Sequence, residues 1–183
     1  NDLFVELDYN SAEARVVLAL SGQEQPKIDI HEHVRSKVYG NKYSRDEIKQ
    51  KVFAWLYNPK AQNKKLSSYI DKENLLNKYY SDGIINSPFN RQMRVGEEKA
   101  LNYLVQSTAS DMFLRQAIKV DRLLEETKSE VAFCVHDSLV LDVSKEDRRL
   151  LEDLISAFQE TDLGEFKVNV SIGKDFGNMR KLL

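Results

Sequence analysis

The stretch AFCVHDSLVLDV, residues 132–143, constrains the fold more than any other part of the sequence. Two short apolar runs flank the pair His136 and Asp137. Apolar runs of this length that are joined by two polar residues are typical of a β-hairpin. We therefore predict paired strands over residues 130–135 and 138–143, with His136 and Asp137 at the turn.

The composition is that of an ordinary globular domain. Of the 183 residues, 42% are hydrophobic and 31% are charged, and the net charge of −2 neither demands nor excludes a nucleic-acid partner. No apolar run reaches membrane-spanning length, so no membrane partner is expected. Cys134 is the single cysteine, which excludes an internal disulfide and indicates a reducing compartment. Its place within an apolar run predicts a buried side chain.

The remaining periodicity predicts an α+β fold, a small antiparallel sheet with helices on one side. Strands are expected at residues 3–8 and 166–172, and two short strands around Pro88 within 82–95. Helices are expected at residues 11–21, 31–39, 45–57, 97–126 and 145–159. Residues 58–82 are weakly patterned and predict one short helix and loops.

Two aspartates lie at predicted strand ends. Asp8 ends the strand at residues 3–8, and Asp137 lies at the hairpin turn. If these strands are neighbours, both carboxylates emerge at one edge of the sheet, where burial of like charges raises their pKa values. Two Mg²⁺ ions about 3.5–4 Å apart, held by carboxylates and substrate phosphates, stabilise the attacking and leaving oxygens in phosphoryl transfer. An Asp at a turn is more often only a turn residue, so a phosphate-binding group is needed to favour this interpretation.

Residues 44–59, SRDEIKQKVFAWLYNP, supply a candidate phosphate-binding group. Ser44 and Glu47 have the spacing of a capping box, and Pro59 ends the helical pattern. Every fourth residue falls on one slanted stripe, since four residues turn about 40° past a full rotation. The stripe consists of Arg45, Lys49, Phe53 and Tyr57. The stripe is cationic at one end and aromatic at the other, which suits a nucleoside triphosphate. The alternative is that its charged end is simply solvated and its two aromatic residues belong to the core.

Five stretches resemble, in the same order, motifs of family A DNA polymerases of the bacterial polymerase I and bacteriophage type. LDYNSAEARVVLALSG (7–22) is similar to DYSxxELRxLAxLSG, DIHEHVRSKVYG (29–40) to DIHxxTAxxVFG, and RDEIKQKVFAWLYN (45–58) to RxxxKxxxFxxxYG. ALNYLVQSTASD (100–111) is similar to AxNxxxQGTAAD, and VHDSLVLDV (135–143) to VHDELVFEV. The ending GKDFGNMRKL is most similar to bacteriophage members. The resemblance implies an antiparallel palm sheet with packed helices and a reduced helical fingers subdomain.

The resemblance also implies a reaction, the two-metal transfer of a deoxynucleotide from its triphosphate to a DNA primer 3′-hydroxyl on a template. The positions that match ligands of the two Mg²⁺ ions are Asp8, Asp137 and the carbonyl of Tyr9. The positions that match nucleotide-binding residues are Arg45, Lys49, Phe53, Tyr57, His31 and Glu13. The positions that match contacts to the primer–template are Asn102, Gln106, His136 and Arg91.

Individual roles follow from the same resemblance. Lys49 is expected to be catalytic beside the leaving pyrophosphate, and His31 to reach the outer phosphates. Glu13 matches the glutamate that excludes ribonucleotides and hydrogen-bonds the tyrosine matched by Tyr57. Phe53 implies discrimination against dideoxynucleotides. Arg15, in the first motif, matches a buried structural arginine.

The resemblance divides the chain into palm at residues 1–28 and 96–183 and fingers at 29–95. The chain begins on a strand without methionine and has no motif of a thumb or exonuclease domain, so we expect a fragment. The expected partners are primer–template DNA, deoxynucleoside triphosphates, and a missing N-terminal thumb or exonuclease region or other replication proteins. The expected location is the cytoplasm of a bacterium or a phage-infected cell.

The sequence departs from the family motifs in three places. Ser138 stands where the motif has glutamate after the aspartate, which removes a carboxylate from the expected metal site. Asn58 and Pro59 replace the glycine after the fingers tyrosine, and Ser107 replaces a glycine.

Three alternatives remain on the sequence alone. A catalytically silent fragment would bind DNA or nucleotide without turnover because it lacks its thumb. A two-metal nuclease or phosphatase would use the carboxylates without needing the Arg45–Tyr57 stripe. A structural domain would show no dependence on Mg²⁺.

Overall fold

The computed structural model describes residues 2–58 and 60–182. Pro59, which was predicted to end a helix, lies outside the described residues. The chain forms two compact units, the first made of Asn1–Ala12 with Ser110–Leu183 and the second of Glu13–Ala109. Among the helices that the structure describes, none is both long and apolar enough to cross a membrane.

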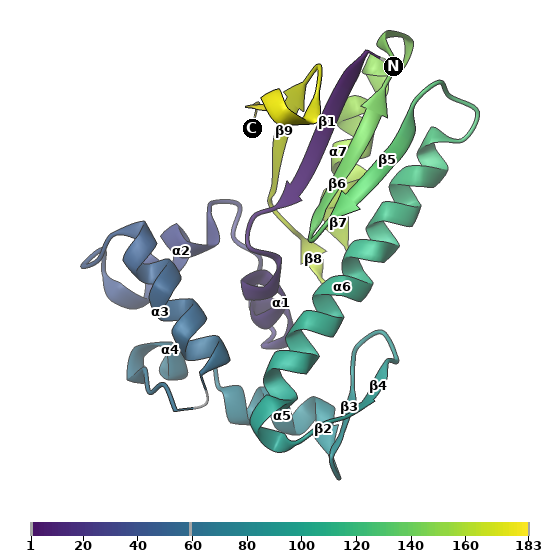
Figure 1. Ribbon diagram of the computed structural model, residues 1–183. Coiled ribbons are helices and arrows are strands. Elements are labelled where there is room, and N and C mark those ends of the chain that lie inside the picture. Colours follow the sequence, from purple (N-terminus) through teal and green to yellow (C-terminus); the bar gives the residue numbers. More distant parts are fainter. Residues whose placement is uncertain (1, 59, 183) are drawn as a thin grey trace. The chain divides into compact units, whose positions relative to one another are not determined.

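The first unit is built on a five-stranded antiparallel sheet, shown in Figure 1. Its strands, in spatial order, are β10 (Arg180–Lys181), β9 (Val168–Gly173), β1 (Leu3–Tyr9), β6 (Ser138–Val143) and β5 (Glu130–Val135). The central strand β1 pairs with β6 on one side and β9 on the other. The predicted hairpin and the predicted first strand are therefore confirmed.

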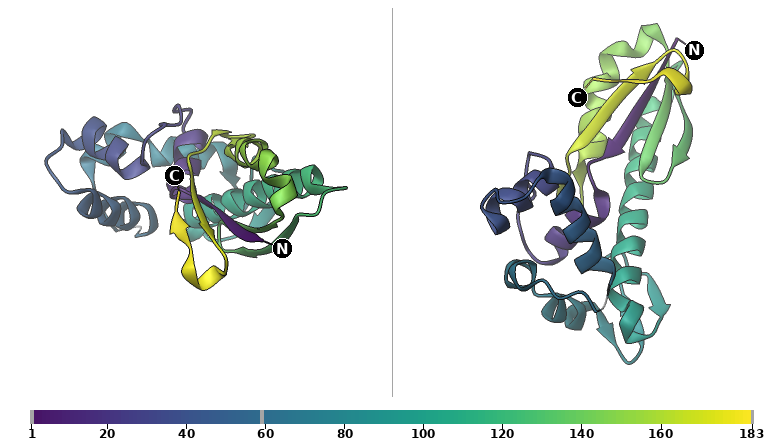
Figure 2. Two further views of the ribbon diagram at one scale, coloured as in Figure 1. Left: turned by 90° about the horizontal axis from the view of Figure 1, so that it is seen from above. Right: turned by 60° about the vertical axis from the view of Figure 1, so that its left-hand side comes forward.

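The two faces of the sheet differ in burial along the central strand β1. Alternate residues of β1 from Val5 to Tyr9 are buried, whereas Glu6 and Asp8 between them are only half-buried. Helix α7 (Leu151–Gln159) covers the buried face, as Figures 1 and 2 show. The Tyr9 ring stacks on Phe158 of α7 at 4.3 Å between centroids, and its hydroxyl donates a hydrogen bond to the Phe158 carbonyl at 2.6 Å. Glu6 and Asp8 therefore lie on the face opposite α7, because strand side chains alternate.

The predicted helix at residues 145–159 has two parts. A 3₁₀ helix, η1 (Lys145–Leu150), leads into α7, and the Ser144 side chain caps it by accepting from the Glu146 amide. Short 3₁₀ segments are frequent at the start of α-helices, so the amphipathic pattern alone did not separate the two. Short elements that the sequence did not predict complete the unit: β7 (Glu160–Thr161), β8 (Gly164–Glu165) and η2 (Phe176–Asn178).

The prediction that Cys134 is buried is wrong. Cys134 is exposed because β5 is an edge strand, paired only with β6, and most of its side chains are exposed. An apolar run predicts a strand equally well at the centre or the edge of a sheet, and only the centre buries both faces.

The second unit is mainly helical. Its elements are α1 (Ala12–Leu20), α2 (Ile30–Tyr39), α3 (Arg45–Tyr57), α4 (Lys64–Tyr69), α5 (Lys72–Tyr79), the small sheet of β2 (Tyr80–Ser81), β3 (Ile84–Asn86) and β4 (Gln92–Arg94), and the first part of α6 (Glu97–Leu124). Residues 58–82 hold two helices where one was predicted. Side chains of Asn63 and Asp71 cap them by accepting from the Leu66 and Asn74 amides.

Local capping fixes both ends of α2 and the start of α3. The Asp29 carboxylate accepts from the amides of His31 and Glu32 at the start of α2. Gly40 ends α2 in the left-handed conformation, at φ 59°, where glycine carries no Cβ penalty. The predicted capping box of α3, Ser44 with Glu47, is present. The helix that carries the Arg45–Tyr57 stripe therefore begins where the sequence predicts.

The structure confirms that Arg15 is a buried structural arginine, as predicted. Its guanidinium is fully buried and donates to the carbonyls of Pro26 at 2.9 Å and Ile28 at 2.8 Å. Burial lowers its pKa to about 10, and the nearby Asp29 charge opposes that shift. Because these bonds join α1 to the segment before α2, Arg15 fixes the approach to the Asp29 cap.

Candidate functional site

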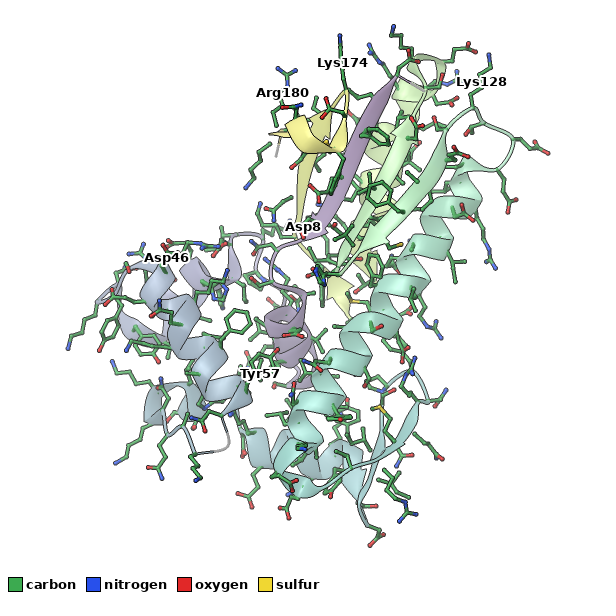
Figure 3. All side chains as sticks on the ribbon, in the orientation of Figure 1. Asp8, Asp46, Tyr57, Lys128, Lys174 and Arg180 are labelled. Carbon is green, nitrogen blue, oxygen red and sulfur yellow. The ribbon has the colours of Figure 1, made fainter. Side chains whose placement is uncertain are left out.

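The β1–β6 pairing brings together the two predicted metal ligands of the first unit. Asp8 stands directly opposite Ser138 in the antiparallel register, and Asp137 is the residue before Ser138. Figure 3 shows Asp8 at the end of β1. Both carboxylates therefore reach the same edge of the sheet, as the sequence predicts.

The surroundings of Asp8 disfavour its ionised form. Burial is the largest cause of a raised Asp8 pKa, and the charges of Asp137 and Glu6 raise it further. The Asn169 side chain donates to Asp8 Oδ2 at 3.1 Å and lowers the pKa, as does the charge of Lys181. A half-buried carboxylate beside two other acidic groups is stabilised by a cation, so this edge suits a positive ligand.

The donor set at this edge fits Mg²⁺. Asp8 and Asp137 supply hard oxygen atoms, and Mg²⁺ is usually held by one or two carboxylates together with waters and substrate phosphates. Within residues 2–58 and 60–182, no group of three or more His, Cys, Asp or Glu could hold a metal ion.

The hairpin turn presents His136 in an uncommon conformation. His136 has a φ of 53°, in the left-handed region, and its side chain is exposed. Non-glycine residues in this region are uncommon and often occur at functional sites. The turn therefore directs an exposed imidazole to the neighbourhood of Asp137, where a primer contact was predicted.

Glu6 and Asn169 are site neighbours that sequence reasoning missed. Asn169 of β9 stands opposite Asp8, and Glu6 lies two residues before Asp8 on the same face. The Ser138 hydroxyl donates to Glu6 Oε1 at 3.2 Å. Strand alternation places Glu6 beside Asp8, but finding Asn169 required the β1–β9 register, which no local pattern gives.

The predicted Arg45–Tyr57 stripe forms a continuous row in the second unit. The Phe53 and Tyr57 rings stack at 5.8 Å between centroids with 26° between planes, and Lys49 Nζ lies 6.0 Å from the Phe53 centroid. Lys49 is exposed, and Phe53 and Tyr57 are half-buried. The alternative of two core aromatics is disfavoured, because the buried positions of α3 belong to another face. Those positions are Ile48, Val52, Trp55 and Leu56.

Ion pairs hold Arg45 at the N-terminal end of the stripe. It contacts Asp29 at 2.8 Å and Asp46 at 3.2 Å, and its side chain is 39% exposed. The hydrogen bond to Asp29 is the largest cause of a raised Arg45 pKa. Asp29, which sequence reasoning missed as a site neighbour, therefore orients the guanidinium as well as capping α2.

His31 lies beneath the stripe. It is fully buried, and its ring is 6.1 Å from the Phe53 ring. Burial lowers the His31 pKa to about 4, with Arg45 and Lys49 among the positive charges that lower it further and Asp29 opposing them. The imidazole is therefore neutral at pH 7, and an approach to phosphate would use a neutral N–H donor rather than an imidazolium charge.

Tyr57 and Asn102 line one cavity of about 530 Å³ in the second unit. The Tyr57 hydroxyl is buried and has no hydrogen-bond partner among the described residues. The hydrogen bond from the Tyr57 hydroxyl to the Glu13 carboxylate, which the resemblance implies, is therefore not formed in this structure. Asn102 Oδ1 is likewise buried and unsatisfied within the described part of the chain. Both residues line the cavity, but these two polar atoms are not accessible to solvent in this structure.

The other predicted primer–template residues lie at the surface. Gln106 is exposed on α6, one helical turn after Asn102. Arg91 is exposed between β3 and β4, where its backbone bonds to Ser87. Lys49, Gln106 and Arg91 are thus accessible to a large ligand.

Comparison with known proteins identifies the family. The model of DNA polymerase family A matches residues 64–179, more than half of the chain. The chain therefore belongs to DNA polymerase family A, which confirms the resemblance of its motifs.

The chain spans about a quarter of the curated relative that it matches and about two fifths of the matched solved chain. DNA polymerase I of Chloroflexus aurantiacus is 24% identical over 232 aligned residues, covering 98% of this chain and 24% of that protein. The POL domain of Pol1 from M. smegmatis, in complex with DNA primer-template and dNTP, matches with a TM-score of 0.73 and 20% identity. That match covers 94% of this chain and 39% of the solved chain, and it confirms the α+β fold.

Proposed function

We propose that this chain is the palm and fingers of a DNA-directed DNA polymerase that copies a template by two-metal nucleotidyl transfer. The observation that carries this proposal is the β1–β6 register, which sets Asp8 opposite the residue that follows Asp137. Membership of family A and the continuous Arg45–Tyr57 stripe support it. The proposed palm comprises residues 1–28 and 96–183, and the proposed fingers residues 29–95.

Asp8 and Asp137, with the carbonyl of Tyr9, would hold two Mg²⁺ ions. When bound, the ions supply the positive charge that favours attack of a primer 3′-hydroxyl on the α-phosphorus of the nucleotide. The protein's part is to hold the carboxylates in place. Asn169 orients Asp8 by a hydrogen bond, and the stack of Tyr9 on Phe158 fixes the end of β1.

The Arg45–Tyr57 stripe would bind the incoming deoxynucleoside triphosphate. Arg45 and Lys49 would neutralise phosphate charge, and His31, which is fully buried in this structure, would have to become accessible to add a neutral donor. Lys49 is the catalytic residue of the stripe, because an exposed ammonium can stabilise or protonate the leaving pyrophosphate. Phe53 and Tyr57 would lie along the sugar and base.

Specificity for deoxynucleotides and for the primer end would come from the remaining residues. Glu13 would exclude a ribose 2′-hydroxyl, and Phe53 would discriminate against dideoxynucleotides. The proposed primer–template contacts are Asn102, Gln106, His136 and Arg91. The chain spans about a quarter of its curated relative, so a thumb or exonuclease region and other replication proteins are proposed partners. A bacterial or phage-infected cytoplasm is the proposed location.

Primer extension tests the function directly. A labelled primer on a template is incubated with Mg²⁺ and each deoxynucleoside triphosphate in turn. Template-directed synthesis predicts a longer product only with the complementary nucleotide, and no product with Asp137→Ala. Shortening of the primer would indicate a nuclease instead. Nucleotide binding without extension by the chain would favour the catalytically silent fragment.

A further inference from the structure

The sheet face opposite α7 holds a carboxylate that the family motifs do not assign. Glu6 pairs with Val140 across β1 and β6, and Asp8 pairs with Ser138. Glu6 and Ser138 are therefore diagonal neighbours on one face, close enough for a long side chain to span. The Ser138 hydroxyl donates to Glu6 Oε1 at 3.2 Å, which joins the two strands beside Asp8.

Ser138 also controls the turn that carries Asp137. It is 5% exposed, and its hydroxyl lies 3.1 Å from the Val135 carbonyl on the other side of the turn. The hydroxyl has one proton, and an ionised carboxylate is the stronger acceptor, so Glu6 directs that proton toward β1. The contact ties the base of the His136–Asp137 turn to the strand that carries Asp8.

The negative charge of Glu6 is placed to attract cations. Its side chain shares the half-buried face with Asp8, opposite the face that α7 covers. Glu6 is not among the positions matched to metal ligands, and its carboxylate accepts a hydrogen bond from the Ser138 hydroxyl, so it would act on the metal site through Ser138 rather than as a ligand. A carboxylate in such a position strengthens a metal site by orienting the ligands and adding charge.

We propose that Glu6 is a positioning residue of the metal site, which acts through Ser138 on the Asp137 turn. It supplies from β1 the carboxylate that the motif places directly after Asp137 on β6, where this chain has Ser138. The inference rests on the proposed metal-binding function of Asp8 and Asp137.

Binding of Mn²⁺ to the full chain tests this inference without requiring polymerase activity. Unbound Mn²⁺ is counted by electron paramagnetic resonance in titrations of each variant. Glu6→Gln keeps the shape of the side chain and removes its charge, and it should weaken Mn²⁺ binding about tenfold. Glu130→Gln is the matched control, because Glu130 is an exposed carboxylate at the far end of the same sheet. This variant should bind Mn²⁺ as tightly as the unmodified chain does.

Two further variants separate positioning from general damage. Ser138→Thr keeps the hydroxyl and should retain binding, whereas Ser138→Ala should weaken it. In the double variant Glu6→Gln with Ser138→Glu, the carboxylate returns to β6, and Mn²⁺ affinity should recover most of the loss. Thermal unfolding of each variant checks that it is folded.

The results distinguish this inference from the proposed function. If Asp8→Asn abolishes binding while Glu6→Gln binds as tightly as the unmodified chain, Glu6 has no such role and the metal site stands. If Asp8→Asn also leaves binding unchanged, both the inference and the proposed metal site are wrong. If Glu6→Gln weakens Mn²⁺ binding and the double variant does not recover it, then Glu6 does not replace the carboxylate that the motif places after Asp137.

Discussion

At the scale of single residues, Asp8 carries a charge that the folded chain disfavours without a cation. Burial, the largest cause, raises its pKa above the ordinary 3.8. An acid with a raised pKa stabilises the fold while it is protonated, and that contribution is lost as the pH rises through its folded-state pKa. We therefore expect Asp8→Asn to raise the free energy of unfolding at about pH 7 without divalent ions, and to change it little once the pH is low enough to protonate Asp8.

Urea unfolding with and without Mg²⁺ checks this expectation. Mg²⁺ should stabilise the unmodified chain and not the Asp8→Asn variant, because a ligand stabilises only the state that binds it. Asp121→Asn, at an exposed position of α6, is the control and should show neither effect. A less stable Asp8→Asn variant at about pH 7 would contradict the burial argument.

Substitutions of His136 distinguish a functional role of this residue from a stabilising one. Its φ of 53° suits glycine better than histidine, so His136→Gly should keep or raise stability by up to about 1 kcal/mol. The same change should weaken primer affinity if the imidazole contacts the primer end. His136→Val should destabilise the chain, because β-branched residues resist this conformation. Denaturant midpoints and primer binding measure the two effects, and a strong loss of stability in His136→Gly would show that the imidazole itself holds the turn.

At the scale of elements, the cap of α3 should contribute measurable stability. Ser44→Ala removes a side-chain oxygen that accepts from the Glu47 amide, and we expect a loss of about 1 kcal/mol. Ser36→Ala in α2 is the control, since its hydroxyl only bonds back to the His33 carbonyl and alanine favours helix. Equal midpoints for Ser44→Ala and the unmodified chain in urea would show that packing alone fixes the start of α3.

The two faces of α3 should differ in nucleotide binding. Lys49 lies on the stripe, whereas Lys51 is about 200° further around the helix and lies 4.4 Å over the Tyr43 ring. Lys49→Ala should weaken triphosphate binding about tenfold, equivalent to about 1.4 kcal/mol, and Lys51→Ala should leave it unchanged. Calorimetric titration with a deoxynucleoside triphosphate measures both, and equal losses would indicate non-specific charge attraction.

Local sequence patterns predicted the secondary-structure elements better than they predicted the exposure and the tertiary contacts of their residues. The hairpin turn, the capping box of α3 and the Arg45–Tyr57 stripe depend on neighbours within a few residues, so the sequence was sufficient. The exposure of Cys134 depends on which strand lies at the sheet edge, and the contact of Asn169 with Asp8 depends on pairing across 161 residues of sequence. Such properties arise from strand order and register, which short-range periodicity does not encode.

At the scale of the whole molecule, the chain belongs to DNA polymerase family A, and its two compact units carry different kinds of functional side chain. The first unit supplies a pair of carboxylates on a rigid antiparallel sheet, and the second supplies a cationic and aromatic helix face. Sites built on strands and helices hold their side chains more precisely than sites on loops.

The most direct test of the central claim is the Mg²⁺ dependence of primer extension by the chain and by its Asp8→Asn and Asp137→Asn variants, with Glu130→Gln as control. We predict extension that rises with Mg²⁺ for the unmodified chain and the control, and falls at least about a hundredfold in both aspartate variants. Extension that is unaffected by either aspartate substitution would contradict the assignment of this sheet edge as the site of DNA synthesis.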